Sequence, residues 1–197
     1  MRAPPVTCIE DSMTFLTDPA SSIPTFPGVD TVAEIGRLLS SASQIGDVYS
    51  QFAGLVGELI GFDRLSVSAI DSSTGLMEIL YVDGIYLSDR DAGFGHPLDG
   101  TLAGSMIENG RVVAIDGATT ISDWPGMDEL KAAGLQSALV SSLMIEGDLV
   151  GVMMLAQKSP DGFAAKELAM AGQIASQISG SVAVEMRRDG IYRHLAA

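Results

Sequence analysis

Two almost wholly apolar runs, separated by three turn residues, constrain the fold of this chain most strongly. The runs span 138–145 and 149–156, and Glu146, Gly147 and Asp148 lie between them. A short link of this composition joins antiparallel strands in a β-hairpin. Because neither strand has a polar face, both faces must be covered. We therefore expect this hairpin at the centre of a sheet that carries further structure on either side.

A second hairpin is predicted earlier in the chain. Apolar and polar residues alternate over 64–70, which is the period of a strand with two unlike faces. One face carries Leu65, Val67 and Ala69, and the other carries Arg64, Ser66 and Ser68. Turn-forming residues 71–75 lead into a strand over 76–82, and a long loop containing glycine follows at 83–100. A further strand is expected over 111–115.

Apolar residues at helical spacing predict helices before and after these strands. Thr31 and Glu34 have the T-x-x-E spacing of a capping box, so a helix is expected to begin there. Gly46 and Asp47 separate it from a second helix that closes at Gly61. The apolar stripe of residues 163–188 predicts a long final helix.

Two short helices are expected in the middle of the chain. The first is expected to have Thr101 as its N-cap residue and to stop at Gly110. The second begins near 123–125 and ends at Gly134. Both precede the apolar hairpin, so they are available to cover one face of the sheet.

Charge and cysteine content exclude several classes of function. The sequence has 11 Lys and Arg against 25 Asp and Glu, a net charge of −14. Such a field repels phosphate backbones and anionic membrane surfaces, so we expect no nucleic-acid and no membrane partner. Apolar stretches are far shorter than the ~20 residues of a spanning helix. A single cysteine, Cys8, is typical of a reducing cytoplasm.

The chain is expected to form one domain with two extensions. Residues 1–29 are rich in proline, which discourages helix and favours an extended N-terminal arm. The domain itself is expected over 30–188. Residues 189–197 would extend the last helix towards an output module or the end of the chain, although Gly190 weakens that helical run.

The order of elements and three segments resemble the GAF family. The segment GFDRLSVSAID (61–71) is similar to the family's first strand, and HPLDGTLAGSMIENGRVVAID (96–116) to its loop, short helix and strand. SALVSSLMIEGDLVGVMMLAQKS (137–159) is similar to its closing hairpin. The resemblance covers roughly residues 30–188. It implies an α/β fold of the α+β kind, with a twisted antiparallel sheet of five to six strands between helices.

The resemblance also implies a function. It suggests a sensory or regulatory module of a signalling protein, such as a two-component system. A small molecule would bind on the sheet face opposite the first and last helices, in a pocket roofed by residues 83–134. A homodimer formed through the terminal helices would pass the change along the last helix to an output domain. A ligand-free dimerisation scaffold is the alternative function.

Catalysis is not expected. The sequence lacks G-x-S-x-G, H-E-x-x-H, P-loop and C-x-x-C motifs, and two histidines with one cysteine leave few ways to assemble a nucleophile and a base. Family members that reduce free methionine sulfoxide use several cysteines, which this chain does not have. Gln157 and Lys166 depart from the N-K-x-F-x-D-E type of signature found in the family's cyclic-nucleotide binders.

Eight residues are candidates for lining the pocket. Hydroxyls on apolar strands need partners, which a ligand or water can supply, although nearby backbone is the commoner partner. Tyrosine and tryptophan add apolar area with a polar tip. The candidates are Ser66, Ser68, Tyr81, His96, Thr101, Met106, Trp124 and Ser141.

Two tetrapyrroles are alternative ligands. His96, just before the first short helix, could present an imidazole nitrogen to haem iron, or could be an ordinary loop histidine. Cys8 could attach a bilin through a thioether, or could be a free thiol in the N-terminal arm. No other metal site is predicted.

Overall fold

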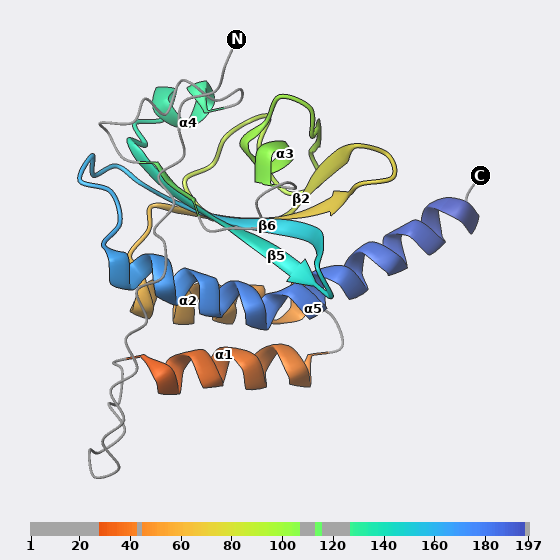
Figure 1. The fold of residues 1–197 in the computed structure, drawn as a ribbon, viewed down its shortest axis with the longest axis horizontal. Coiled ribbons are helices and arrows are strands. Elements are labelled where there is room, and N and C mark those ends of the chain that lie inside the picture. The colour runs from red at the N-terminus through yellow and green to blue at the C-terminus, as the bar shows by residue number, and fades with distance from the viewer. Residues whose placement is uncertain (1–27, 43–44, 107–112, 116–126, 196–197) are drawn as a thin grey trace.

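The computed structural model describes residues 28–42, 45–106, 113–115 and 127–195. Its helices are α1 (Val29–Ser41), the 3-10 turn η1 (Ile45–Asp47), α2 (Tyr49–Leu59), α3 (Leu102–Met106), α4 (Asp128–Ala132) and α5 (Ala165–Leu195). Its strands are β1 (Arg64–Asp71), β2 (Leu76–Gly84), β3 (Gly95–Pro97), β4 (Val113–Ile115), β5 (Ser137–Ile145) and β6 (Asp148–Gln157). Figure 1 shows their arrangement.

The strands form one antiparallel sheet of six strands in the order β3-β2-β1-β6-β5-β4. The predicted hairpin of β5 and β6 is confirmed, and its turn places Glu146 and Gly147 in the left-handed region at φ 53° and 97°. Strand β6 pairs with both β5 and β1 in the middle of the sheet. The predicted α+β fold is therefore confirmed.

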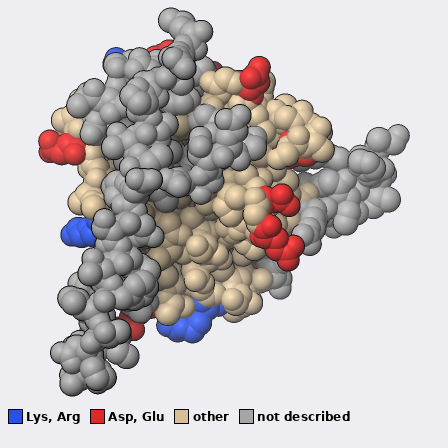
Figure 2. Space-filling view, viewed as in Figure 1, with Lys and Arg blue, Asp and Glu red and all other residues tan. Residues whose placement is uncertain are grey.

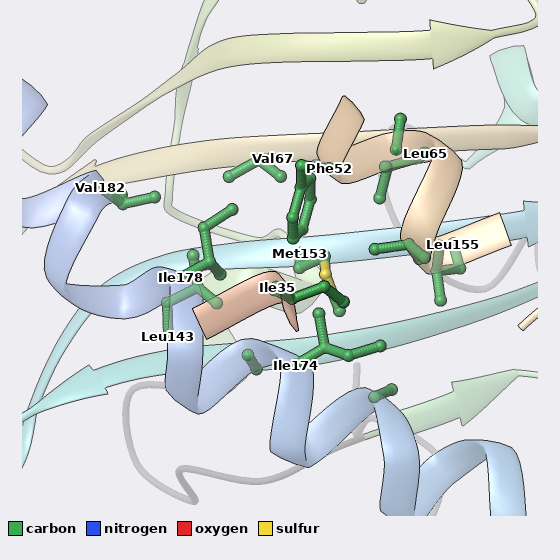
Figure 3. Close-up of a cluster of buried hydrophobic side chains, with 14 of the residues drawn as sticks. Ile35, Phe52, Leu65, Val67, Leu143, Met153, Leu155, Ile174, Ile178 and Val182 are labelled. Atoms are coloured by element: carbon green, nitrogen blue, oxygen red, sulfur yellow. The ribbon is translucent and has the colours of Figure 1, made fainter. Parts of the chain in front are cut away.

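Helices cover both faces of the sheet, as the two apolar arms of the hairpin require. Helices α1, α2 and α5 lie on one face, and α3 and α4 lie on the other (Figure 1). The core on the first face joins side chains of the three long helices to one face of the central strands (Figure 3). Its fully buried members include Ile35, Phe52, Val67, Leu143, Met153, Ile174 and Ile178.

The last helix is longer than the globular body needs. It continues through Gly190 to Leu195, and its C-terminal turns extend past the sheet (Figure 1). Among residues 165–186 of this helix, whose burial the structure describes, Val182 is the last that is fully buried. In the parts of the chain that the structure describes, no helix has the length and apolarity needed to span a membrane.

Two local predictions were wrong. Helix α1 begins at Val29, with Gly28 as its N-cap at φ 98°, and no side chain caps it. The capping box fails because Thr31 already lies inside the helix: the N–H of Val32 donates to the carbonyl oxygen of Gly28 at 2.9 Å. The loop predicted over 83–100 contains β3, an edge strand of three residues that is too short to show an alternating pattern.

Gly84, where β2 ends, tests how tightly the loop after β2 is packed. Its φ of 87° disfavours any side chain, and an added Cβ would lie 2.1 Å from the carbonyl oxygen of Asp63. Gly75 has a similar φ of 68° but open space around it. We expect Gly75→Ala to cost about 1–2 kcal/mol of unfolding free energy, and Gly84→Ala to cost about 1–3 kcal/mol more. Urea unfolding of both variants measures the difference, and equal losses would contradict the tight packing.

Candidate functional site

A cavity of about 60 Å³ lies between the sheet and the segments that cover its second face. We call it the roof cavity. Its floor comes from β1, β2, β5 and β6, and its roof comes from the segments between β2 and β5. The lining residues are Arg64, Ser66, Ser68, Met77, Ile79, Val140, Val152 and Met154 in the floor, and Arg90, Thr101, Leu102, Ala103 and Met127 in the roof.

The period of β1 builds the polar part of the floor. Leu65, Val67 and Ala69 belong to the core between the sheet and helices α1, α2 and α5, which we call the helix-side core. The alternate residues of β1 therefore face the roof cavity. Ser66 pairs with Met154 and Ser68 pairs with Val152 on β6, and all four line the cavity. The predicted alternation is confirmed, and both faces of the strand are buried.

Ser66 and Ser68 are available to a ligand, whereas Thr101 is not. The two serines are 5% and 4% exposed, and both line the cavity. The hydroxyl of Thr101 donates to the carbonyl oxygen of Leu98 at 2.7 Å and accepts from the N–H of Gly104 at 3.1 Å. Thr101 therefore caps α3, as predicted, and positions the roof.

Arg64 is a site residue that the sequence analysis did not select. Its side chain is only 1% exposed, and its guanidinium donates to the carbonyl oxygens of Ile85 and Arg90. Its Nε has no partner among the described residues. Burial lowers the pKa of Arg64, while the charge of Asp91 acts in the opposite direction and that of Arg90 lowers the pKa further. A guanidinium nevertheless stays protonated in proteins.

Arg90 places a second guanidinium at the roof cavity. Its Nη2 lies 3.8 Å from a carboxylate oxygen of Glu129 on α4, and about half of the Glu129 side chain is exposed. Solvent-exposed pairs of this kind contribute little, about 0–1 kcal/mol. Because Arg90 also accepts a hydrogen bond from Arg64 through its backbone, the roof segment is tied to the floor at this point.

His96 lies beside the roof cavity rather than in its wall. It is on β3 opposite Met77, and its Nε2 is buried without a partner in the described part of the chain. Burial is the main cause that lowers the pKa of His96, followed by the charge of Arg90, while Glu129 and Asp89 act in the opposite direction. The imidazole is therefore neutral at pH 7.

Tyr81 and Ser141 do not reach the roof cavity, contrary to expectation. Tyr81 pairs with Val67 and shares its face, and its ring stacks on Tyr49 with centroids 3.8 Å apart. Ser141 pairs with Met153 in the helix-side core, where its hydroxyl is buried without a described partner. Ser141 takes the opposite face because it alternates with Val140, which lines the cavity, whereas Tyr81 takes it because a bulge in the pairing of β1 and β2 shifts the register between Tyr81 and Ile79.

The side chains of the remaining candidates lie outside what the structure describes. Met106 is the last residue of α3, and Trp124 and Cys8 lie outside the described residues. The roof cavity does not fit a haem or a bilin, since it is far below the ~300 Å³ of the smallest usual ligand pockets, and His96 is not in its wall. Among the described residues, no three histidine, cysteine, aspartate or glutamate side chains form a metal-binding group.

The lowered pKa of His96 predicts how stability depends on pH. Below the usual histidine pKa of about 6.5 the unfolded chain takes up the proton first, so stability falls with pH until the folded pKa is reached. We expect the wild type to lose more stability than His96→Asn between about pH 7.5 and pH 5.5, by at most about 1.4 kcal/mol per pH unit. Urea unfolding of both proteins at both pH values measures this. The same slope in His96→Asn would contradict the burial of the imidazole.

Known proteins with similar sequences or structures share this architecture. The family model of the GAF domain matches residues 45–182. No curated protein matches the chain significantly. The GAF domain of a phosphoenolpyruvate-protein phosphotransferase from Coxiella burnetii has 16% identity and a TM-score of 0.69, with 83% of this chain and 96% of that chain covered.

Two further solved structures come from signalling proteins and photoreceptors. The GAF domain of a two-component sensor histidine kinase from Bacillus halodurans has 20% identity and a TM-score of 0.63, with 74% of this chain and 99% of that chain covered. The phycoerythrobilin-bound GAF domain of a cyanobacterial phytochrome has 17% identity and a TM-score of 0.63, covering 81% and 95%. At these identities the structures share the fold alone, whereas the family model spans most of the chain. The chain belongs to the GAF domain family.

Proposed function

We propose that this chain is a cytoplasmic sensory domain that binds a small molecule in the roof cavity and regulates an output domain of a signalling protein. The observation that carries the proposal is a cavity whose floor contains two buried serines and a buried arginine, with Nε of that arginine lacking a partner among the described residues. A core without a ligand would be expected to have apolar side chains there, because an unsatisfied buried polar group is costly. The sensor kinase and phytochrome among the similar structures support a signalling role.

The packing around Gly151 supports a route from the cavity to α5. A Cβ added at this residue of β6 would lie 2.3 Å from the carbonyl oxygen of Ser68 and 3.3 Å from Cγ1 of Val182. Val182 of α5 therefore lies close to β6 at a position where the strand has no side chain. Because the packing at this point is close, a ligand that shifts the backbone of β1 would also displace α5.

The exposed part of α5 supports a homodimer. Val184 is 52% exposed, and the helix continues past the sheet beyond it. A partner copy packing on α1 and α5 would cover this surface and carry movement of α5 to the output domain. The competing function is a ligand-free dimerisation scaffold, which the small size of the roof cavity favours.

A variant that fills the roof cavity distinguishes the two functions. We expect a small metabolite that binds the cavity to stabilise the folded wild type by about 2.7 kcal/mol when its concentration is a hundred times its Kd. This stabilisation raises the Tm. Ser68→Val should abolish this stabilisation because its side chain occupies the floor of the cavity. Ser141→Val is the matched control on the other face of the sheet and should respond like the wild type.

If no metabolite raises the Tm, and if Ser68→Val is more stable than the wild type, the proposed ligand-binding function is contradicted. That outcome favours the scaffold. Sedimentation equilibrium tests the dimer separately, and a monomer at all concentrations would contradict transmission between two copies of α5.

A further inference from the structure

The positive charge of Arg64 has no carboxylate partner in the described part of the chain. The guanidinium contacts two backbone carbonyl groups, and the one described ion pair joins Arg90 to Glu129 instead. Carbonyl dipoles satisfy some of the donors but do not neutralise the charge. Because a buried charge is costly unless it is paired, the roof cavity favours an anionic occupant.

Further donors in the cavity floor point to the same occupant. Arg64, whose Nε has no described partner, alternates along β1 with Ser66 and Ser68, and the three residues line one row of the cavity floor. Hydroxyls can donate or accept, so they do not select a charge themselves. The guanidinium selects it, and the serines supply additional donors to the oxygens of an anion.

The positive charge of Arg64 lies inside a protein whose net charge is strongly negative. Acidic side chains are spread over several parts of the described surface in Figure 2, and the whole chain carries a charge of −14. General electrostatic attraction therefore does not draw an anion to this protein. Specific hydrogen bonds inside the cavity must hold it.

Volume and lining limit the anion to a small one with an apolar part. A cavity of about 60 Å³ has room for about four water molecules, and thus for about four or five non-hydrogen atoms. Most of its wall is aliphatic or thioether, including Ile79, Val140 and Met127. A phosphate dianion would leave oxygens against this apolar wall without donors, whereas a short-chain carboxylate places its alkyl group there.

We infer that the ligand of the roof cavity is a short-chain monocarboxylate whose oxygens accept hydrogen bonds from Arg64, Ser66 and Ser68. This inference rests on the proposed function, since it names the ligand of the same cavity. Arg90 is the second cation. Its pair with Glu129 is long and partly exposed, so Arg90 can leave Glu129 and close over the carboxylate.

Calorimetry and thermal unfolding of the full chain with acetate and propionate test the inference. Sodium chloride at equal ionic strength is the salt control, and acetamide is a neutral molecule of the same shape as acetate. We expect saturable binding and a raised Tm with the two carboxylates alone. Arg64→Met should weaken acetate binding at least about tenfold, since hydrogen bonds to charged groups are the strong ones.

A second pair of variants covers the case in which Arg64→Met does not fold, since that change removes the donors to Ile85 and Arg90. Arg90→Gln should weaken acetate binding at least about threefold. Arg37→Gln changes an exposed arginine on α1, on the other side of the sheet, and should bind acetate like the wild type.

Each contrary outcome has a distinct meaning. Equal stabilisation by acetamide, or stabilisation by inorganic phosphate alone, overturns the carboxylate and leaves the sensor intact. A neutral metabolite that binds independently of both arginines does the same. If no small molecule binds, the sensor and its carboxylate ligand fail together, and the chain's own carboxylates must balance Arg64.

Discussion

The pairing of β1 with strands on both sides is the constraint on which the rest of the structure depends. Because β2 and β6 flank it, its hydrogen bonds are satisfied within the sheet and its side chains are forced towards two covered faces. Leu65, Val67 and Ala69 join the core beneath the three long helices, and the alternate residues face the roof cavity. One strand thus contributes both to the stability of the fold and to the candidate site.

Much of this architecture could be predicted from the sequence because it follows from periodicity. The apolar arms of the last hairpin indicated a central, doubly covered position, and β6 occupies it. The strand β3 and the start of α1 were missed for a physical reason. Three residues show no period, and the hydroxyl and carboxylate of a T-x-x-E sequence form a capping box only if the backbone leaves the helix at that threonine.

The candidate site was predictable only in part. Ser66 and Ser68 were identified because hydroxyls are unusual on a buried strand, and they line the cavity. Arg64 was overlooked, although it alternates with them, because an arginine at the start of a strand is normally solvated. Tyr81 shows the limit of such reasoning: a bulge between β1 and β2 sets its register, and that irregularity leaves no mark in the residue pattern.

The position of Gly151 links the energetic problem at Arg64 to the mechanics of α5. A buried guanidinium that forms no described ion pair raises the free energy of the empty state, so an anion that pairs with it would also favour the arrangement of β1 in which its donors converge. A Cβ added at Gly151 would lie 3.3 Å from Cγ1 of Val182, so α5 lies close to β6 at a position where the strand has no side chain. Since packed interiors deform little, a change in β1 is more easily accommodated by moving the helix than by compressing the sheet. In the proposed sensor, the buried charge would therefore supply the free energy of the change, and the missing side chain at Gly151 would supply its path to α5.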